Sequence, residues 1–144
     1  RSTQAKTLFP YTTLFRSGYS SKAALITRGL HEMRKLALAR GCKAETINGL
    51  SGLGDVVLTA SSLISRNFKF GHLIAQGVDP EEARKQIGMV VEGAYTAKSA
   101  LELARSLNID MPIAEIVYRI IYEKMKPHEA VKSLMVRTIK EEHL

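Results

Sequence analysis

The stretch PIAEIVYRII, residues 112–121, has the clearest structural signal in the chain. Its branched apolar residues are Ile113, Ile116, Val117, Ile120 and Ile121. Intervals of three and four place such residues on one face of an α-helix, whereas a half-buried strand alternates polar and apolar residues. Proline is also favoured at the first position of a helix. The stretch therefore predicts an amphipathic helix that begins at Pro112 and buries its apolar face.

The same spacing recurs toward the N-terminus. Residues 20–40 contain a second apolar stripe with intervals of three and four, which predicts another amphipathic helix. Ser20 or Ser21 is a suitable N-cap for it, because a serine hydroxyl accepts from the free N–H groups of a first turn. Gly41 follows the last apolar residue and is a suitable end, since glycine adopts the left-handed conformation readily.

Helix punctuation dominates the rest of the chain. Asp79 precedes a proline and two glutamates, which together predict a helix start, and Gly88 predicts its end. Further helices are predicted over residues 93–107 and from Pro127 onward. Since no run alternates with period two for long enough to form a convincing strand, the fold class predicted is all-α.

The composition fits one domain. The chain has 144 residues, of which 45% are hydrophobic and 24% charged. That length can bury a core but is too short for a two-domain enzyme. Cys42 is the single cysteine, so an internal disulfide is excluded and a reducing compartment is favoured. The net charge of +7 would point to nucleic acid or an anionic membrane if every residue were native.

Residues 1–17 differ in character from everything that follows. They contain no acidic residue and no helical period. Their segment TLFPYTTLFRS, residues 7–17, resembles the in-frame translation of a common sequencing adaptor. We therefore expect residues 1–17 to be non-native and disordered, and residues 18–144 to form a helical substrate-binding domain. The latter carry 18 basic and 14 acidic groups, a net charge of only +4.

Metal and nucleophilic chemistry find little support in the sequence. The histidines are His31, His72, His128 and His143, and none lies at a metal-ligand spacing from another. Cys42 has no partner cysteine. We therefore predict no metal site and no nucleophile of the Ser–His or Cys–His kind.

The densest glycine segment is GLSGLGD, which ends at Asp55. It lacks the G-x-G-x-x-G spacing of a dinucleotide-binding turn. We expect a loop in which the backbone turns or approaches a neighbour closely. Asp55 follows where a helix begins, and two roles remain open for it. It could cap that helix, or its carboxylate could accept a hydrogen bond from a substrate hydroxyl.

Ser65, Arg66 and Asn67 form a second candidate site. A hydroxyl, a guanidinium and an amide occur together at a predicted helix start, where N–H groups favour an anion. Lys69 adds positive charge, although an N-cap serine with two solvated neighbours explains the pattern equally well. Glu92 lies in a joint between two helices, where it could cap a helix or hydrogen-bond a ribose or a nicotinamide amide.

An ordered set of short motifs resembles the bacterial NAD(P)-dependent glycerol-3-phosphate dehydrogenases. The set comprises KAALITRGL at 22–30, GLSGLGDVVLT at 49–59, SRN at 65–67, FG at 70–71, IG at 87–88, VVEG at 90–93, TAK at 96–98, MPI at 111–113 and LMVR at 134–137. Each motif alone is weakly specific. Their order and spacing across residues 18–144 make the resemblance specific.

The resemblance implies a place for the chain within a larger enzyme. That family joins an N-terminal Rossmann domain, which binds NAD or NADP, to an all-helical C-terminal domain that binds the substrate. Residues 18–144 resemble most of the helical domain, of the 6-phosphogluconate-dehydrogenase-like type, with the Rossmann domain missing. The implied enzyme is cytoplasmic and reduces dihydroxyacetone phosphate reversibly to sn-glycerol 3-phosphate for glycerophospholipid synthesis. A homodimer is one possible assembly of that enzyme.

The resemblance also assigns roles to individual residues. The family's substrate-binding positions fall on Asp55, Ser65, Arg66 and Asn67. Its cofactor-contacting positions fall on Arg66, Val90 and Glu92. The catalytic lysine of the family falls upstream of Gly18, so we expect no catalytic residue in this chain and no activity from the chain alone.

The alternative from a different class is a stand-alone basic helical module that binds nucleic acid or an anionic partner. The dehydrogenase interpretation implies no nucleic acid, no membrane insertion and no metal. The two differ in the upstream reading frame, where only the dehydrogenase requires a strand–turn–helix unit with a glycine fingerprint.

Overall fold

A computed structural model describes residues 18–60, 62 and 64–141. This described part is all-helical and contains no strand, as the apolar spacing predicts. The interpretation of residues 1–17 as adaptor-derived and disordered lies outside the described residues and stays a prediction. Among the helices that are described, none is long and apolar enough to cross a membrane.

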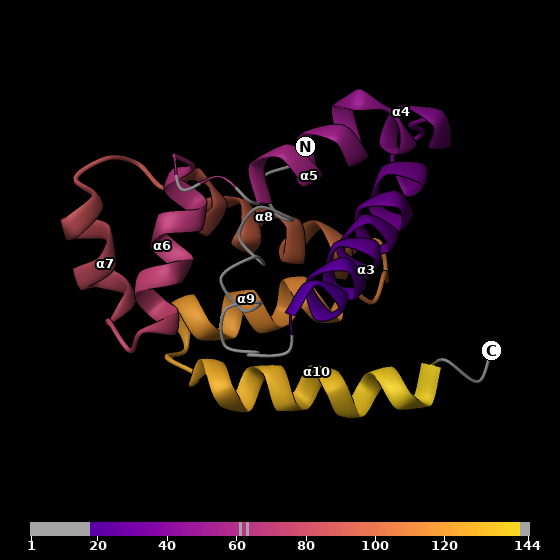
Figure 1. Ribbon diagram of the computed structural model, residues 1–144. Coiled ribbons are helices and arrows are strands. Elements are labelled where there is room, and N and C mark those ends of the chain that lie inside the picture. The colour runs from indigo at the N-terminus through magenta and orange to yellow at the C-terminus, as the bar shows by residue number, and fades with distance from the viewer. Residues whose placement is uncertain (1–17, 61, 63, 142–144) are drawn as a thin grey trace.

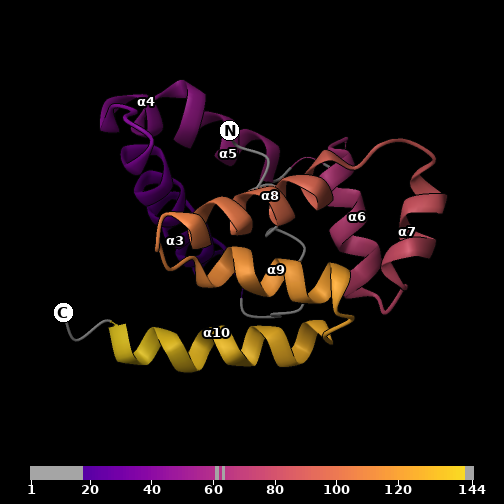
Figure 2. The same cartoon turned by 180° about the vertical axis from the view of Figure 1, so that it is seen from behind.

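The helices pack around a central one. In chain order they are α3 (Gly18–Ala39), α4 (Ala44–Asn48), the π-helix η1 (Leu50–Gly54), α5 (Asp55–Ala60), α6 (Arg66–Ala75), α7 (Pro80–Ile87), α8 (Glu92–Ser106), α9 (Pro112–Tyr122) and α10 (Pro127–Glu141). Helix α9 lies between α8 and α10, as Figures 1 and 2 show from opposite sides. Helices α6 and α7 pack together at one end of the molecule, and α3 and α4 at the other.

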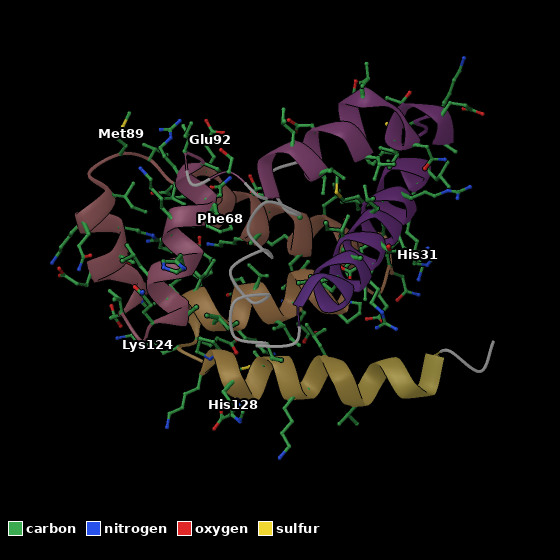
Figure 3. All side chains as sticks on the ribbon, viewed as in Figure 1. His31, Phe68, Met89, Glu92, Lys124 and His128 are labelled. Atoms are coloured by element: carbon green, nitrogen blue, oxygen red, sulfur yellow. The ribbon has the colours of Figure 1, made fainter. Side chains whose placement is uncertain are left out.

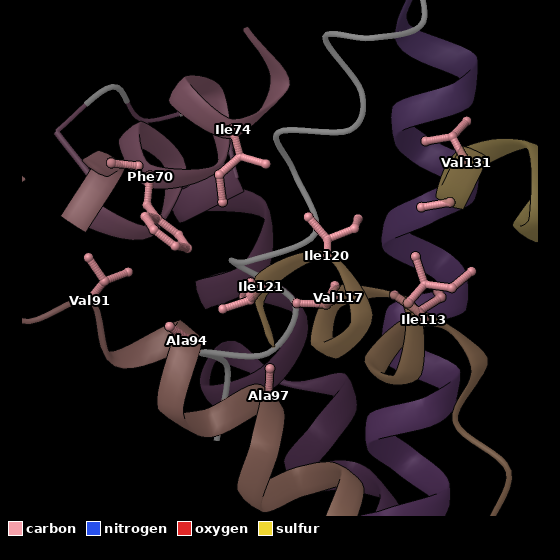
Figure 4. Packing of buried hydrophobic residues seen from close by; sticks show 13 residues of the cluster. Phe70, Ile74, Val91, Ala94, Ala97, Ile113, Val117, Ile120, Ile121 and Val131 are labelled. Atoms are coloured by element: carbon pink, nitrogen blue, oxygen red, sulfur yellow. The ribbon is translucent and has the colours of Figure 1, made fainter. Parts of the chain in front are cut away.

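The apolar face predicted for residues 112–121 forms the centre of the main core. Ile113, Val117 and Ile120 of α9 are each at most 2% exposed. They pack with buried residues of α6, α7, α8 and α10, and Figure 4 shows this cluster from close by. Full burial of one such side chain contributes about 1.5–3 kcal/mol to folding. The amphipathic helix predicted from this stretch is confirmed.

Most of the predicted helix boundaries are also confirmed. The carboxylate of Asp79 accepts from the backbone N–H of Glu81 at 3.0 Å, and Gly88 ends α7 in the left-handed conformation with φ of +66°. Gly41 likewise has a φ of +79° after α3. The capping role expected for Ser20 or Ser21 is wrong, because α3 already begins at Gly18 and both serines lie inside it.

The glycine segment is helical rather than a loop. η1 runs directly into α5, so the backbone of Asp55 is itself helical, with φ of −65° and ψ of −38°, and its N–H donates to the carbonyls of Leu50 and Gly52. An N-cap residue has extended backbone outside its helix, so the capping role considered for Asp55 is wrong. The predicted close backbone approach is confirmed at Gly52, because a Cβ there would lie 2.6 Å from the carbonyl carbon of Ile47 and closer still to its oxygen.

Replacing Gly52 by Ala is expected to lower the free energy of unfolding by about 2 kcal/mol, because backbone atoms of Ile47 cannot move aside as a side chain does. Gly54→Ala is the matched control, since its added Cβ would meet the flexible Leu50 side chain at 3.3 Å. That variant is expected to be neutral, or more stable by up to about 1 kcal/mol. Urea unfolding measures both, and equal stability of the two variants would contradict the close approach.

A buried carboxylate links α3 to the start of α9. The side chain of Glu32 accepts from the backbone N–H groups of Ile113 at 2.7 Å and Ala114 at 3.2 Å. These N–H groups belong to the first turn of α9 and have no acceptor within their own helix. Burial raises the pKa of Glu32 to about 7, while the two backbone hydrogen bonds lower it; Asp110 raises it further and Lys35 lowers it. Glu32 therefore fixes the orientation of α3 against the central helix.

Candidate functional site

The hollow formed where α6 and α8 begin is the strongest candidate site. It has a volume of about 350 Å³. Its lining residues are Ser62, Ile64, Ser65, Arg66, Asn67, Val90 and Glu92. Residues more than twenty positions apart in the sequence thus meet around one space. Five of the six predicted site residues line it, and Asp55 is the exception.

Ser65 begins the site by capping α6. Its backbone is extended, with φ of −64° and ψ of 124°, and its hydroxyl oxygen accepts from the N–H of Phe68 at 3.4 Å. The N-cap considered for Ser65 is confirmed, but its neighbour Asn67 is buried and not solvated. A hydroxyl that accepts one hydrogen bond can still donate its own proton to a ligand. Ser65 therefore combines helix capping with a donor at the hollow.

Asn67 joins the starts of the two helices. Its side chain is largely buried, with 8% of the residue exposed, and its Oδ1 accepts from the backbone N–H of Gly93 at 3.0 Å. Gly93 follows Glu92 at the start of α8, so this hydrogen bond holds the carboxylate of Glu92 near α6. The Nδ2 group of Asn67 is the part that remains to donate to a ligand.

Arg66 is placed against the segment that leads into α8. Its Nη1 donates to the carbonyl of Val90 at 3.1 Å, which orients the guanidinium across the hollow. Val90 is 61% exposed, and Figure 3 shows Met89 and Glu92 at the same end of the molecule. The remaining N–H donors of Arg66 point to recognition of an anion, since guanidinium groups bind phosphate and carboxylate oxygens in pairs.

The hollow has a positively charged side and a negatively charged side. Arg66 and the start of α6 supply positive charge, because a helix N-terminus carries unpaired N–H groups. Glu92 is exposed at the start of α8, where the helix dipole favours its negative charge. The hollow can therefore hold an anionic group beside Arg66 and accept hydrogen bonds from a second group at Glu92.

Asp55 is separated from this arrangement. It is the half-buried first residue of α5 and does not line the hollow. A six-residue helix rises about 8 Å between its first and last residue, and the hollow begins beyond the far end, at Ser62. The hollow therefore does not bring Asp55 together with Arg66.

Two lining residues escaped prediction. Ser62 accepts from the N–H of Ile64 through its hydroxyl, at 3.3 Å, and Ile64 is 87% exposed. The available signal was an apolar residue directly before the Ser65–Asn67 run, which the sequence places at the end of the apolar stretch 56–64. Neither lysine nor histidine is among the described residues that line the hollow, so these residues offer no proton donor of those types.

The histidines lie on separate helices. His31 is on α3, His72 on α6 and His128 on α10, and Figure 3 shows His31 and His128 far apart. No group of three or more His, Cys, Asp or Glu residues that could hold a metal is found within residues 18–60, 62 and 64–141. His143 lies outside these ranges.

Comparison with known protein families shows which family the chain belongs to. Residues 11–132 match the family model described as NAD-dependent glycerol-3-phosphate dehydrogenase C-terminus. The chain belongs to this family. The match confirms the resemblance seen in the motifs, and the all-helical fold agrees with a C-terminal domain of such a dehydrogenase.

Several relatives are similar over most of the chain. A glycerol-3-phosphate dehydrogenase [NAD(P)+] of Protochlamydia amoebophila is 66% identical over 127 residues, which are 88% of this chain and 38% of the relative. That of Chlamydia pneumoniae is 55% identical over the same shares. The crystal structure of glycerol-3-phosphate dehydrogenase from Coxiella burnetii superimposes with a TM-score of 0.88 at 40% identity, covering 93% of this chain and 41% of that one. The chain thus spans about two fifths of these relatives.

Proposed function

We propose that this chain is the substrate-binding part of an NAD(P)-dependent glycerol-3-phosphate dehydrogenase. Such an enzyme transfers a hydride between the cofactor and the central carbon of dihydroxyacetone phosphate or sn-glycerol 3-phosphate. The gathering of five expected site residues around one hollow is the observation that supports this function. Its volume of about 350 Å³ falls within the usual range for small-ligand sites.

In this proposal Ser65, Arg66 and Asn67 hold the phosphate of the triose. Arg66 supplies the positive charge and paired donors, while the hydroxyl of Ser65 and the Nδ2 group of Asn67 add single hydrogen bonds. The start of α6 adds its own favourable potential for a doubly charged group. Asp55 would approach the triose from another side and accept from one of its hydroxyl groups.

The residues at the rim also fit a nicotinamide cofactor. Glu92 is an exposed acceptor for a ribose hydroxyl or a carboxamide N–H, the exposed residue Val90 lines the same hollow, and Arg66 offers a cation to a diphosphate. When bound, NADH or NADPH supplies the hydride. The cofactor contacts of this chain would therefore position the nicotinamide, with the main binding surface on the segment that the longer relatives add.

The proposal assigns no proton donor to this chain. The carbonyl oxygen of the triose gains a proton when the hydride is added, and a positioned acid normally supplies it. The family's catalytic lysine falls upstream of Gly18. Binding and orientation without that acid and without a full cofactor site do not complete the reaction, so the chain alone is expected to be inactive.

The cellular setting follows from the proposed substrates. We place the enzyme in the cytoplasm, consistent with a single cysteine, and give it glycerophospholipid synthesis as its role. We propose no nucleic-acid partner, because the cations Arg66 and Lys69 lie beside small hollows. A homodimer of the whole enzyme belongs to the same proposal.

A chimeric enzyme tests the proposed function. The N-terminal part of the Protochlamydia amoebophila relative, joined before Gly18, is expected to give dihydroxyacetone-phosphate-dependent oxidation of NADH or NADPH. The 144-residue chain alone, shown to be helical by circular dichroism, is expected to give none above the blank. Absorbance at 340 nm measures both. A folded chimera without activity, or an active isolated chain, would contradict the proposal.

A further inference from the structure

A second hollow lies on the other side of Arg66. It also has a volume of about 350 Å³. Its lining residues are Arg66, Lys69, His72 and Leu73 of α6, Gln86 and Ile87 of α7, and Met89 of the segment after α7. Among the residues that the structure describes, Arg66 alone lines both this hollow and the candidate site. The proposed function leaves the second hollow without a role.

The polar side of the second hollow is positive. Arg66 and Lys69 are both exposed and lie three positions apart on α6, which brings them onto one face of the helix. Within the described part of the chain, no acidic residue lines the hollow. Gln86 adds an amide whose Nε2 is 3.5 Å from Glu82, at the long limit of a hydrogen bond, so it can turn toward a ligand.

His72 has a buried polar atom that its protein neighbours do not satisfy. Its Nδ1 is buried and finds no hydrogen-bond partner among the described residues. The ring stacks on Phe68 with centroids 6.4 Å apart and planes 9° apart, which restricts its orientation. Because buried polar atoms are nearly always paired, this one leaves an unmet hydrogen bond beside the hollow, which a ligand oxygen can satisfy once the His72 ring turns toward it.

The remaining wall is apolar. Leu73, Ile87 and Met89 line it. Met89 is 64% exposed, although moving a methionine side chain out of water is favourable. A bare inorganic ion would leave these side chains in contact with water. A ligand with an anionic group and an apolar body would cover them.

We propose that this second hollow binds a phosphomonoester with an apolar body. Arg66 and Lys69 hold the phosphate, His72 and Gln86 hydrogen-bond to its oxygens, and the body covers Leu73, Ile87 and Met89. Arg66 has five N–H donors, so it can serve this phosphate from one edge while it faces the candidate site with the other. The binding site goes beyond the proposed function and does not depend on catalysis.

Phenyl phosphate and inorganic phosphate are the probes that test this site. Each is titrated into the ¹⁵N-labelled 144-residue chain, and shifts at Lys69, His72 and Gln86 are followed by NMR. Phenyl phosphate is expected to bind about tenfold more tightly than inorganic phosphate, because half of a phenyl ring leaves water. Equal affinities, or an absence of shifts at these three residues, would overturn the proposal.

A matched pair of charge changes locates the binding. Lys69→Gln is expected to raise the Kd for phenyl phosphate about fivefold, whereas Lys85→Gln, which removes the same charge from an exposed position of α7 outside the hollow, leaves it unchanged. Equal weakening by both variants would overturn the site as a general charge effect. Shifts confined to Ser65 and Glu92 would also overturn it while supporting phosphate binding in the candidate site. The chimera's activity is a separate readout, so the two proposals can fail independently.

Discussion

Replacing Glu32 by Ala is expected to lower the free energy of unfolding by about 3 kcal/mol at pH 5.5. The change removes both acceptors from the first turn of α9 and leaves the N–H groups of Ile113 and Ala114 buried without partners. It also opens a void between α3 and α9, which adds to the loss. Because whole domains are stable by only about 5–15 kcal/mol, urea unfolding will resolve this change easily.

The loss is expected to shrink as the pH rises. Burial raises the pKa of Glu32 from its ordinary 4.5 to about 7, so the folded state binds the proton more tightly than the unfolded state does. The free energy of unfolding of the wild-type chain therefore falls as the pH rises from 4.5 to about 7, because the folded state must release that proton. Above pH 7 the ionisation of Glu32 causes little further change. Between pH 5.5 and 8 the linkage amounts to about 2 kcal/mol, so Glu32→Ala should cost only about 1 kcal/mol at pH 8.

Two variants control this experiment. Glu32→Gln keeps one acceptor and the shape of the side chain, so it should cost about 1 kcal/mol at pH 5.5 and be about 1 kcal/mol more stable than the wild type at pH 8. Glu102→Ala removes an exposed carboxylate from α8 and should change stability by less than about 0.5 kcal/mol at either pH. A cost of Glu32→Ala that is constant with pH would contradict the raised pKa, and a negligible cost at pH 5.5 would contradict the capping role.

The contact of Glu32 with α9 could not be predicted from the sequence, unlike most of the helices. Apolar spacing and caps predicted α7 and α9 correctly, because those signals lie within a few residues of one another. The hydrogen bond from Ile113 to Glu32 joins positions 81 residues apart, so no local pattern contains it. The π-helix was missed for a different reason, since its glycines favoured a loop although the close approach of Gly52 to Ile47, five residues away, agrees with the sequence.

Part of the candidate site could likewise be predicted from neighbouring residues, and part depends on how the helices pack. Ser65, Arg66 and Asn67 are consecutive, so an anion-binding helix start could be predicted from their chemistry alone. Nothing local to Val90 or Glu92 connected them to that run. The connection is made by two hydrogen bonds, from Arg66 to Val90 and from Gly93 to Asn67, which only packing of α6 beside α8 creates. Their cofactor role came from resemblance to a family, and the chimera is needed to test it.

Arg66 provides the sharpest test of how that site works. In the active chimera, Arg66→Gln is expected to lower kcat/KM for dihydroxyacetone phosphate about 100-fold, because it removes charge-assisted hydrogen bonds worth about 1.5–3 kcal/mol each. Since the phosphate is bound equally in the ground and transition states, most of the loss should appear as a higher KM. The KM for the cofactor should rise as well, because the guanidinium faces both ligands in the proposed arrangement.

Two further arginine variants separate the chemistry of Arg66 from its charge. Arg66→Lys keeps the positive charge but loses the planar fork and the hydrogen bond to Val90, so a loss of about tenfold is expected. Arg105→Gln removes the same charge from an exposed position in the last turn of α8 and should leave kcat/KM within twofold of the parent. If Arg66→Gln also stayed within twofold, Arg66 could not be the phosphate ligand. If Lys replaced Arg66 without loss, the site would require only a charge, and the geometry between α6 and Val90 would have no part in substrate recognition.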